Sequence, residues 1–243
     1  MTYGLLSDIH GNLEALDAVL NELRGVSAFL CLGDIVGYGA DPGPCIERIS
    51  SLPHLICVAG NHDLAAIGSY DLNWFNPYAK AAVEWTAEQL SPSHRSYLGS
   101  LPLTAHADGA ILVHGSLPDE MDYVTTPSEA RRCFDAMPAE LALIGHTHVA
   151  EFYRTKRRTR FPDQVALWSG GRIELTDDLR YIINPGAIGQ PRDGNPDASF
   201  GLWDVAAKTI EVRRVSYDVL SAQARIREAG LPDYLADRLT VGR

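Results

Sequence analysis

The chain is predicted to be an α/β protein in which two packed β-sheets are flanked by helices. Three observations support this class. The first sixty residues alternate between strand and helix patterns, the residues beyond 103 are rich in short strands, and helical patterns separate the two regions. A length of 243 residues lies within the range of one α/β domain. We therefore expect a single domain over residues 1–243.

The first region reads as strand–helix–strand–helix–strand. The apolar run 2–7 lacks alternation and is typical of a buried strand, and Asn12 then caps a helix with leucines at helical spacing. The following elements are a strand at 28–32, a helix at 44–51 and a strand at 55–59. This order predicts a parallel sheet with right-handed crossovers.

Residues 64–101 show no strand pattern. Helices are expected at 77–90 and 92–99. We expect this segment to fold over or beside the edge of the sheet that carries the polar motifs described below. Trp74, Tyr78 and Trp85 are expected to pack these helices together rather than to form a base-stacking platform.

The rest of the chain is mostly strands. Asp108-Gly109 is a strong turn signal and splits a hairpin formed by 103–107 and 110–114. A helix at 128–136 and a buried strand at 141–145 follow. Further strands are expected at 151–155, 165–169, 181–184, 199–204 and 209–216, and two short helices after Tyr217.

Composition and charge exclude several classes of partner. A formal net charge of -10 argues against duplex DNA or an anionic membrane. The basic run 154–160 is expected to be the solvated tip of a hairpin, with nucleic-acid contact as a disfavoured alternative. Four cysteines without a Cys-x-x-Cys pair, no signal peptide and no apolar stretch of membrane-spanning length predict a cytoplasmic protein. Neither terminus shows a clear interface signal, so a homo-oligomer stays open.

The informative residues are polar clusters, each of which follows an apolar, strand-like run. They are Asp8 and His10, Asp34, Asn61 to Asp63, His114, and His146 with His148. Each alone has an ordinary explanation, such as a helix cap or a turn. In an open α/β sheet, however, loops at the carboxyl ends of the strands converge on one edge. Together the clusters therefore predict metal binding.

The residue types indicate which metals. Carboxylates and imidazoles without thiolates suit Mn²⁺, Fe²⁺, Co²⁺, Ni²⁺ or Zn²⁺. There are too many candidate ligands for one ion, which points to a pair of ions about 3.5–4 Å apart.

These motifs, in this order, resemble the calcineurin-like metallophosphoesterase family over residues 5 to about 148. The stretches GDIVGYGADP at 33–42 and INPGAIGQPRDG at 183–194 look like a compact prokaryotic phosphodiesterase branch, and they extend the resemblance to about residue 205. The resemblance implies a four-layer αββα sandwich with two mixed sheets. It also implies two divalent transition-metal ions, with Mn²⁺ the first choice.

The resemblance also implies roles for the motif residues. The first metal would be held by Asp8, His10, Asp34 and His148. The second would share Asp34 and be completed by Asn61, His114 and His146. His62 would assist the leaving group, and Asp63 would orient His62. No ligand position is missing.

The implied reaction is hydrolysis of a small-molecule phosphodiester by in-line attack of a metal-bridging hydroxide. Two alternatives stay open. One is a phosphomonoesterase, acting on phosphoproteins or nucleotides with the same site, and the other is a metal-dependent scaffold without turnover. The presence of His62 and Asp63 argues against the scaffold, since metal binding alone would not require them.

Two further residues are candidates for substrate contact. Tyr38 lies in the glycine-rich stretch after Asp34. Arg192 has the fork geometry to clamp a phosphate, although pairing with Asp193 or Asp197 explains it as well. Asn76 and Tyr78 are interpreted as an ordinary helix start rather than as pocket residues.

Overall fold

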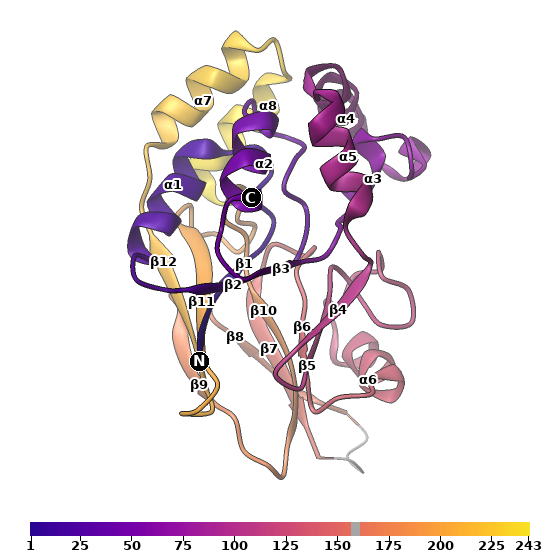
Figure 1. The fold of residues 1–243 in the computed structure, drawn as a ribbon, viewed down its shortest axis with the longest axis vertical. Coiled ribbons are helices and arrows are strands. Elements are labelled where there is room, and N and C mark those ends of the chain that lie inside the picture. Colours follow the sequence, from indigo (N-terminus) through magenta and orange to yellow (C-terminus); the bar gives the residue numbers. More distant parts are fainter. Residues whose placement is uncertain (157–160) are drawn as a thin grey trace.

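The computed structural model describes residues 1–156 and 161–243, and it confirms the predicted α/β class (Figure 1). Residues 157–160 of the basic run lie outside the described residues. At its described end, Arg154 and Lys156 are exposed and pair with Asp163 and Asp178.

Two mixed sheets form the centre of the molecule, each with six strands in the described part of the chain. The first has the order β3 (Leu55–Cys57), β2 (Ala28–Cys31), β1 (Thr2–Leu6), β11 (Ala198–Asp204), β12 (Thr209–Val215) and β9 (Gly171–Glu174). The second has the order β4 (Thr104–Ala107), β5 (Ala110–Val113), β6 (Leu141–Leu143), β10 (Arg180–Pro185), β7 (Ala150–Thr155) and β8 (Asp163–Ala166).

The strands that precede the polar clusters pair in parallel, as predicted for the first sheet. Strand β1 runs parallel to β2, and β2 runs parallel to β3, whereas β11 joins β1 in the antiparallel direction. In the second sheet β5, β6 and β10 are parallel neighbours. The strands that precede polar motifs therefore all belong to parallel runs.

Eight helices flank the two sheets in the described part of the chain. They are α1 (Leu13–Glu22), α2 (Pro42–Ser50), α3 (Asn61–Ala66), α4 (Pro77–Gln89), α5 (Pro92–Ser100), α6 (Pro127–Ala136), α7 (Val219–Glu228) and α8 (Asp233–Asp237), with short 3-10 turns at Leu72–Trp74 and Arg238–Val241. Asn12 caps α1 as predicted, because its side chain accepts a hydrogen bond from the backbone N–H of Ala15.

Side-chain alternation along the strands separates the layers. In β1, Leu5 faces the second sheet, and Leu6 faces α1. Leu112 and Ile183 complete the apolar core between the sheets, and Phe134 of α6 packs on the outer face of the second sheet. The arrangement is the expected αββα sandwich.

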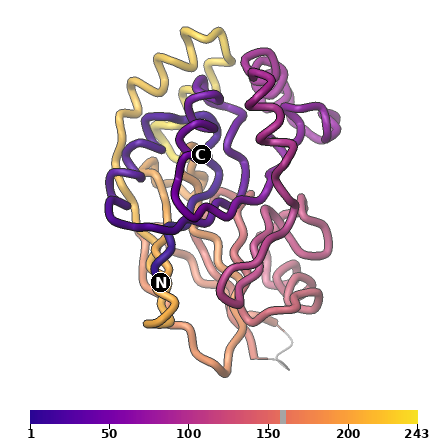
Figure 2. Tube along the Cα trace, viewed as in Figure 1, coloured from indigo at the N-terminus to yellow at the C-terminus, as the bar shows by residue number. Residues whose placement is uncertain are grey.

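Segments distant in sequence meet at one end of this sandwich. The N-terminal helices, the middle segment 64–101 and the C-terminal helices α7 and α8 all lie there, as the colours of Figure 2 show. One apolar cluster joins residues of α4, α7 and α8 around Tyr38. Trp85 packs into it as expected, but Trp74 is 80% exposed and Tyr78 is 47% exposed, so the packing role predicted for these two was wrong.

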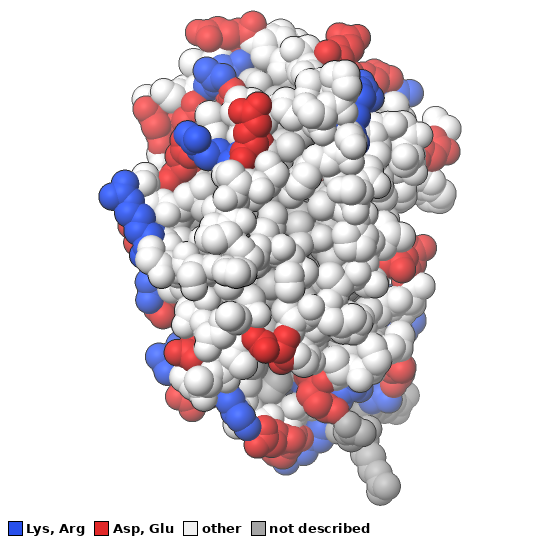
Figure 3. Space-filling model, in the orientation of Figure 1, with Lys and Arg blue, Asp and Glu red and all other residues white. Residues whose placement is uncertain are grey.

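The face of the molecule shown in Figure 3 carries no broad basic patch, as expected for a chain with a net charge of -10. On the side shown in Figure 3, Lys and Arg are interspersed with Asp and Glu. Among the described residues, no helix is long and apolar enough to cross a membrane.

Candidate metal centre

The polar clusters meet where the parallel strands end. Asp8 and His10 follow β1, Asp34 follows β2, Asn61 and His62 open α3 after β3, His114 follows β5, and His146 and His148 follow β6. All of them are buried. The backbone is unusual here, because five of these residues adopt a positive φ, between 51° and 68°: Asp8, His10, Asp34, His146 and His148. Such conformations are uncommon for residues other than glycine and concentrate at functional sites.

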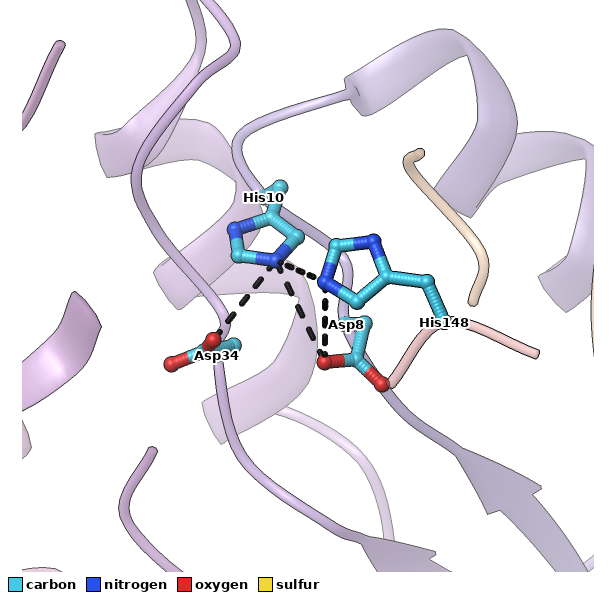
Figure 4. A group of neighbouring side chains, drawn as sticks. All are labelled: Asp8, His10, Asp34 and His148. Carbon is cyan, nitrogen blue, oxygen red and sulfur yellow. Dashed lines mark hydrogen bonds and ion pairs between the residues drawn. The ribbon is translucent and has the colours of Figure 1, made fainter. Parts of the chain in front are cut away.

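The first group consists of Asp8, His10, Asp34 and His148 (Figure 4). The Nε2 atoms of His10 and His148 are 3.0 Å apart. His10 Nε2 is 3.6 Å from Asp34 Oδ2, and His148 Nε2 is 3.4 Å from Asp8 Oδ1. Within the group, one ligand atom from each residue lies within 4.8 Å of the others. Donors at this spacing can surround one ion.

The second group shares Asp34 and adds His114 and His146. His114 Nε2 lies 3.2 Å from Asp34 Oδ2 and 3.0 Å from His146 Nδ1. Asn61 Oδ1 and Asp34 Oδ2 are buried without a hydrogen-bond partner among the described residues. Because a buried polar atom without a partner is costly, these two oxygens are suited to accept an ion.

Backbone carbonyl groups orient three of the imidazoles. Nδ1 of His10 donates to Val36 O at 3.0 Å, and Nδ1 of His114 donates to Leu32 O at 2.7 Å. Nδ1 of His148 donates to the Gln190 carbonyl at 2.6 Å. These bonds direct each Nε2 toward the centre, which is the orientation found for metal-ligating histidines.

The carboxylates are held as firmly. Asp8 Oδ2 accepts the Ser7 hydroxyl at 2.6 Å, and both Asp8 oxygens accept the His146 N–H at 3.1 Å. Asp34 Oδ1 accepts the His62 N–H at 2.9 Å. Gly60 is required beside it, since a Cβ at that position would lie 2.0 Å from Asp34 Oδ1.

Burial and neighbouring charges shift the pKa values of the candidate ligands. Burial lowers the pKa of His10, His146 and His148 well below the usual value, so these rings are neutral at pH 7, the form that binds metals. Burial alone would raise the pKa of Asp34, but His114 holds that pKa well below its usual value. Burial alone would lower the pKa of His114, and the neighbouring Asp34 carboxylate instead raises it to about 10, so an ion bound at His114 would have to displace a proton. The two groups, their unpartnered oxygens and the absence of thiolates from this described site fit two divalent ions of intermediate softness.

His62 lies beside the first group without joining it. Its ring is 4.7 Å from that of His10, 4.5 Å from that of Tyr38 and 4.8 Å from that of Phe75, measured between centroids. Gly37 provides the space, because a Cβ there would be 2.3 Å from His62 Nδ1. Burial lowers the pKa of His62 to about 4. The imidazole is therefore fixed by packing at the rim of the centre.

Asp63 is placed differently from the expectation. Its oxygens accept the backbone N–H groups of Asp34, Ile35, Val36 and Gly60, at 2.8 to 3.2 Å. No hydrogen bond joins Asp63 to His62 among the described residues, so the orienting contact implied by the resemblance is not present. Asp63 instead fixes the loop that carries Asp34.

Tyr38 and Arg192 meet at the centre. The Tyr38 ring lies 4.6 Å from that of His10, and Arg192 Nη2 donates to the Tyr38 hydroxyl at 3.2 Å and to Gln190 Oε1 at 3.1 Å. Arg192 pairs with neither Asp193 nor Asp197 in the described structure, and Asp193 pairs with Arg214 instead. The Arg192 guanidinium thus has no carboxylate partner and lies beside the two groups of candidate ligands.

Two aromatic residues at the centre were not predicted. Tyr123 stacks on His146, with centroids 3.9 Å apart and an interplanar angle of 18°. Phe75 packs against His62. Both lie in loops without a strand-end motif, so the sequence pattern held no signal for them.

Comparison with known proteins agrees with this geometry. The chain is similar to an uncharacterized protein of Methanocaldococcus jannaschii, with 38% identity over 98% of this chain and 97% of the relative. It is similar to the crystal structure of a metallophosphoesterase from Sphaerobacter thermophilus, with 40% identity, a TM-score of 0.91 and coverage of 100% and 99% of the two chains. A hypothetical protein of Pyrococcus horikoshii shares the fold at 23% identity and a TM-score of 0.79, with coverage of 100% and 98%. Residues 1–208 match the model of the calcineurin-like phosphoesterase superfamily domain. The chain therefore belongs to the calcineurin-like phosphoesterase superfamily.

Proposed function

We propose that this protein is a dinuclear-metal phosphodiesterase that hydrolyses a small-molecule phosphodiester. The observation that carries the proposal is the position of Asp34, whose Oδ2 faces His10 of one ligand group and His114 of the other. A carboxylate shared in this way is typical of two-metal sites. The superfamily membership supports phosphoester hydrolysis in general.

In this proposal Asp8, His10, Asp34 and His148 hold one ion, and Asp34, Asn61, His114 and His146 hold the other. Mn²⁺ is the expected metal, and Fe, Ni, Co and Zn are compatible with the same donors. When bound there, two such ions would supply a water of lowered pKa and positive charge opposite the phosphoryl group.

The protein side chains around the ions supply orientation and a hydrogen bond to the leaving group. His62 lies at the rim of the first group and would donate to the leaving oxygen. Tyr38 and Arg192 would fix the ester, with Arg192 binding a non-bridging or neighbouring anionic oxygen. Asp63 would act indirectly, because its carboxylate holds the loop that carries Asp34.

Turnover of matched chromogenic esters tests the proposal. Protein loaded with Mn²⁺ should hydrolyse bis-p-nitrophenyl phosphate with a higher kcat/KM than p-nitrophenyl phosphate. Faster turnover of the monoester would favour the phosphomonoesterase alternative instead. Absence of turnover for both esters, with two ions bound per chain, would favour the scaffold.

The remaining expectations concern context. The cytoplasm stays the predicted compartment, and Cys31, Cys45, Cys57 and Cys133 are free and buried, which suits a reducing environment. Size-exclusion chromatography with light scattering would determine whether the protein forms a homo-oligomer.

A further inference from the structure

A pocket of about 370 Å³ lies beside the candidate metal centre, and its walls come from five distant parts of the chain. Tyr78 comes from α4, and Tyr234 and Arg238 from the C-terminal helices; Tyr38, Tyr123 and Arg192 come from loops of the centre. Tyr38 packs on His10 of the first ligand group and Tyr123 on His146 of the second. The pocket is therefore placed to receive the part of a substrate that extends away from the reacting phosphorus.

The pocket offers aromatic faces to a ligand. Tyr78 and Tyr234 stack on each other, with centroids 4.7 Å apart and an interplanar angle of 26°. They are 47% and 48% exposed, and Tyr123 is 50% exposed although it stacks on His146. Half-exposed rings at a concave site are the surfaces on which nucleobases stack.

The pocket also holds two cations without anionic side-chain partners. Arg192 donates to Tyr38 and Gln190, and Arg238 lies 5.3 Å above the Tyr234 ring and donates to the backbone carbonyl of Arg243. In the described part of the chain neither forms an ion pair with Asp or Glu. Arg214 and Arg225, which lie elsewhere, do form such pairs.

This pair of guanidiniums is notable in a chain with a net charge of -10. Arg192 Nε is buried without a hydrogen-bond partner among the described residues. Arg192 and Arg238 line the same pocket, and burial together with the charge of Arg192 lowers the pKa of Arg238, which is the direction expected for two cations that repel each other. An anion between them would relieve that repulsion, and guanidinium forks match phosphate oxygens well.

We propose that this pocket binds the nucleotide part of the substrate, with the base on the Tyr78–Tyr234 stack and a second phosphate at Arg192 and Arg238. The inference rests on the proposed phosphodiesterase activity, because the ester phosphate must lie at the metal groups. It commits to a nucleotide diester that carries a further phosphate. An uncharged lipid tail would leave both guanidiniums without an anionic side chain or ligand, and a simple dialkyl phosphate would not stack on the tyrosines.

Three diesters with the same leaving group test the assignment. They are methyl p-nitrophenyl phosphate, thymidine 5′-(p-nitrophenyl phosphate) and thymidine 3′-phosphate 5′-(p-nitrophenyl phosphate), assayed with the Mn²⁺-loaded protein. We expect KM to fall about tenfold when the nucleoside is added and about tenfold again with the 3′-phosphate, while kcat changes little. Equal KM values for the three esters would overturn the inference.

Variants assign the two gains to their residues. Tyr234→Ala should abolish the gain from the nucleoside, and Tyr234→Phe, which keeps the ring, should retain it. Arg238→Ala should abolish the gain from the 3′-phosphate. Arg132→Ala is the control. It removes an exposed arginine of α6, which packs on the second sheet, and it should preserve both gains. A loss of both gains in Arg132→Ala, or of neither in the pocket variants, would contradict the assignment.

Binding to the metal-free protein gives a readout that does not depend on turnover. Calorimetry with thymidine 3′,5′-bisphosphate should detect binding that Arg238→Ala weakens about tenfold and Arg132→Ala does not. The two proposals fail separately. Hydrolysis of all three esters with equal KM refutes the nucleotide pocket alone, whereas nucleotide binding without hydrolysis of any ester refutes the phosphodiesterase.

Discussion

Asp34 Oδ2 lies 3.2 Å from His114 Nε2, and this contact joins two loops that belong to different sheets. Asp34 follows β2 of the first sheet, and His114 follows β5 of the second. The candidate metal centre therefore also bridges the two halves of the sandwich. Its geometry depends on how the sheets pack as much as on either loop.

Replacement of Asp34 should weaken binding of both ions, because both ligand groups share this carboxylate. Asp34→Asn keeps the size of the side chain but removes the charge that both ligand groups share. We expect fewer than two ions per chain by elemental analysis and a loss of kcat/KM of at least about 100-fold. His106→Ala, an exposed histidine of β4, is the control and should change neither quantity. Full occupancy and full activity in Asp34→Asn would rule out the shared-ligand assignment.

His62 gives the opposite pattern, because it lies beside the ligands without belonging to either group. His62→Ala should leave the metal content at the value of the unchanged protein and reduce kcat by about 10²- to 10⁴-fold, the usual contribution of a group that assists proton transfer. Metal analysis and turnover are measured on the same preparation. Loss of the ions in this variant would mean that His62 is a ligand.

Asp63 should act on folding as well as on activity. Its carboxylate accepts four backbone N–H groups, from residues 34, 35, 36 and 60. In Asp63→Asn an amide group must face some of these donors, so we expect the free energy of unfolding to fall by about 3 kcal/mol. Chemical denaturation measures this change. Asp71→Asn, an exposed cap of a short 3-10 turn, should cost much less. An equal effect of the two substitutions would contradict a larger stabilising contribution from the buried hydrogen bonds of Asp63.

The strands and the buried groups of candidate metal ligands were predictable because each uses a local pattern. An apolar run followed by Asp, His or Asn marks both a buried strand and its carboxyl end, and the parallel order brings these ends together. Strand β9 was missed, since it has only four residues and buries only Ile173 among them. Helix α3 was missed because its first residues form the Asn61–Asp63 motif itself.

What could not be predicted depends on contacts between distant segments. The bonds of Asp63 to the Asp34 loop, the stacking of Tyr123 on His146 and the meeting of Tyr78 with Tyr234 all span long sequence separations. Nothing in the local pattern distinguishes Tyr78 from a tyrosine that packs a helix. The candidate metal centre is thus encoded by local patterns, whereas the pocket walls depend on the packing of the middle and C-terminal helices.

The buried environment of Glu151 should make the stability of the protein depend on pH, independently of the candidate metal centre. It is buried in β7 and accepts hydrogen bonds from Tyr153 at 2.9 Å and from Gln164 at 2.7 Å. Burial raises its pKa, and these two bonds offset only part of that effect. The folded protein therefore binds this proton more tightly than the unfolded chain does. The resulting contribution to stability is fully present below the unfolded pKa and is lost as the pH rises through the folded pKa.

Glu151→Gln, which stays uncharged at every pH, should therefore gain stability relative to the unchanged protein as the pH rises from 4 to 8. Glu129 is the matched control with the opposite sign. It caps α6 through the backbone of Thr125 and Thr126, and these hydrogen bonds lower its pKa. Its stabilising contribution is present above the unfolded pKa and is lost as the pH falls, so Glu129→Gln should be destabilising at pH 8 and nearly neutral at pH 4. Denaturant unfolding at the two pH values measures both variants, and a common sign for the two would contradict the burial of a charged Glu151.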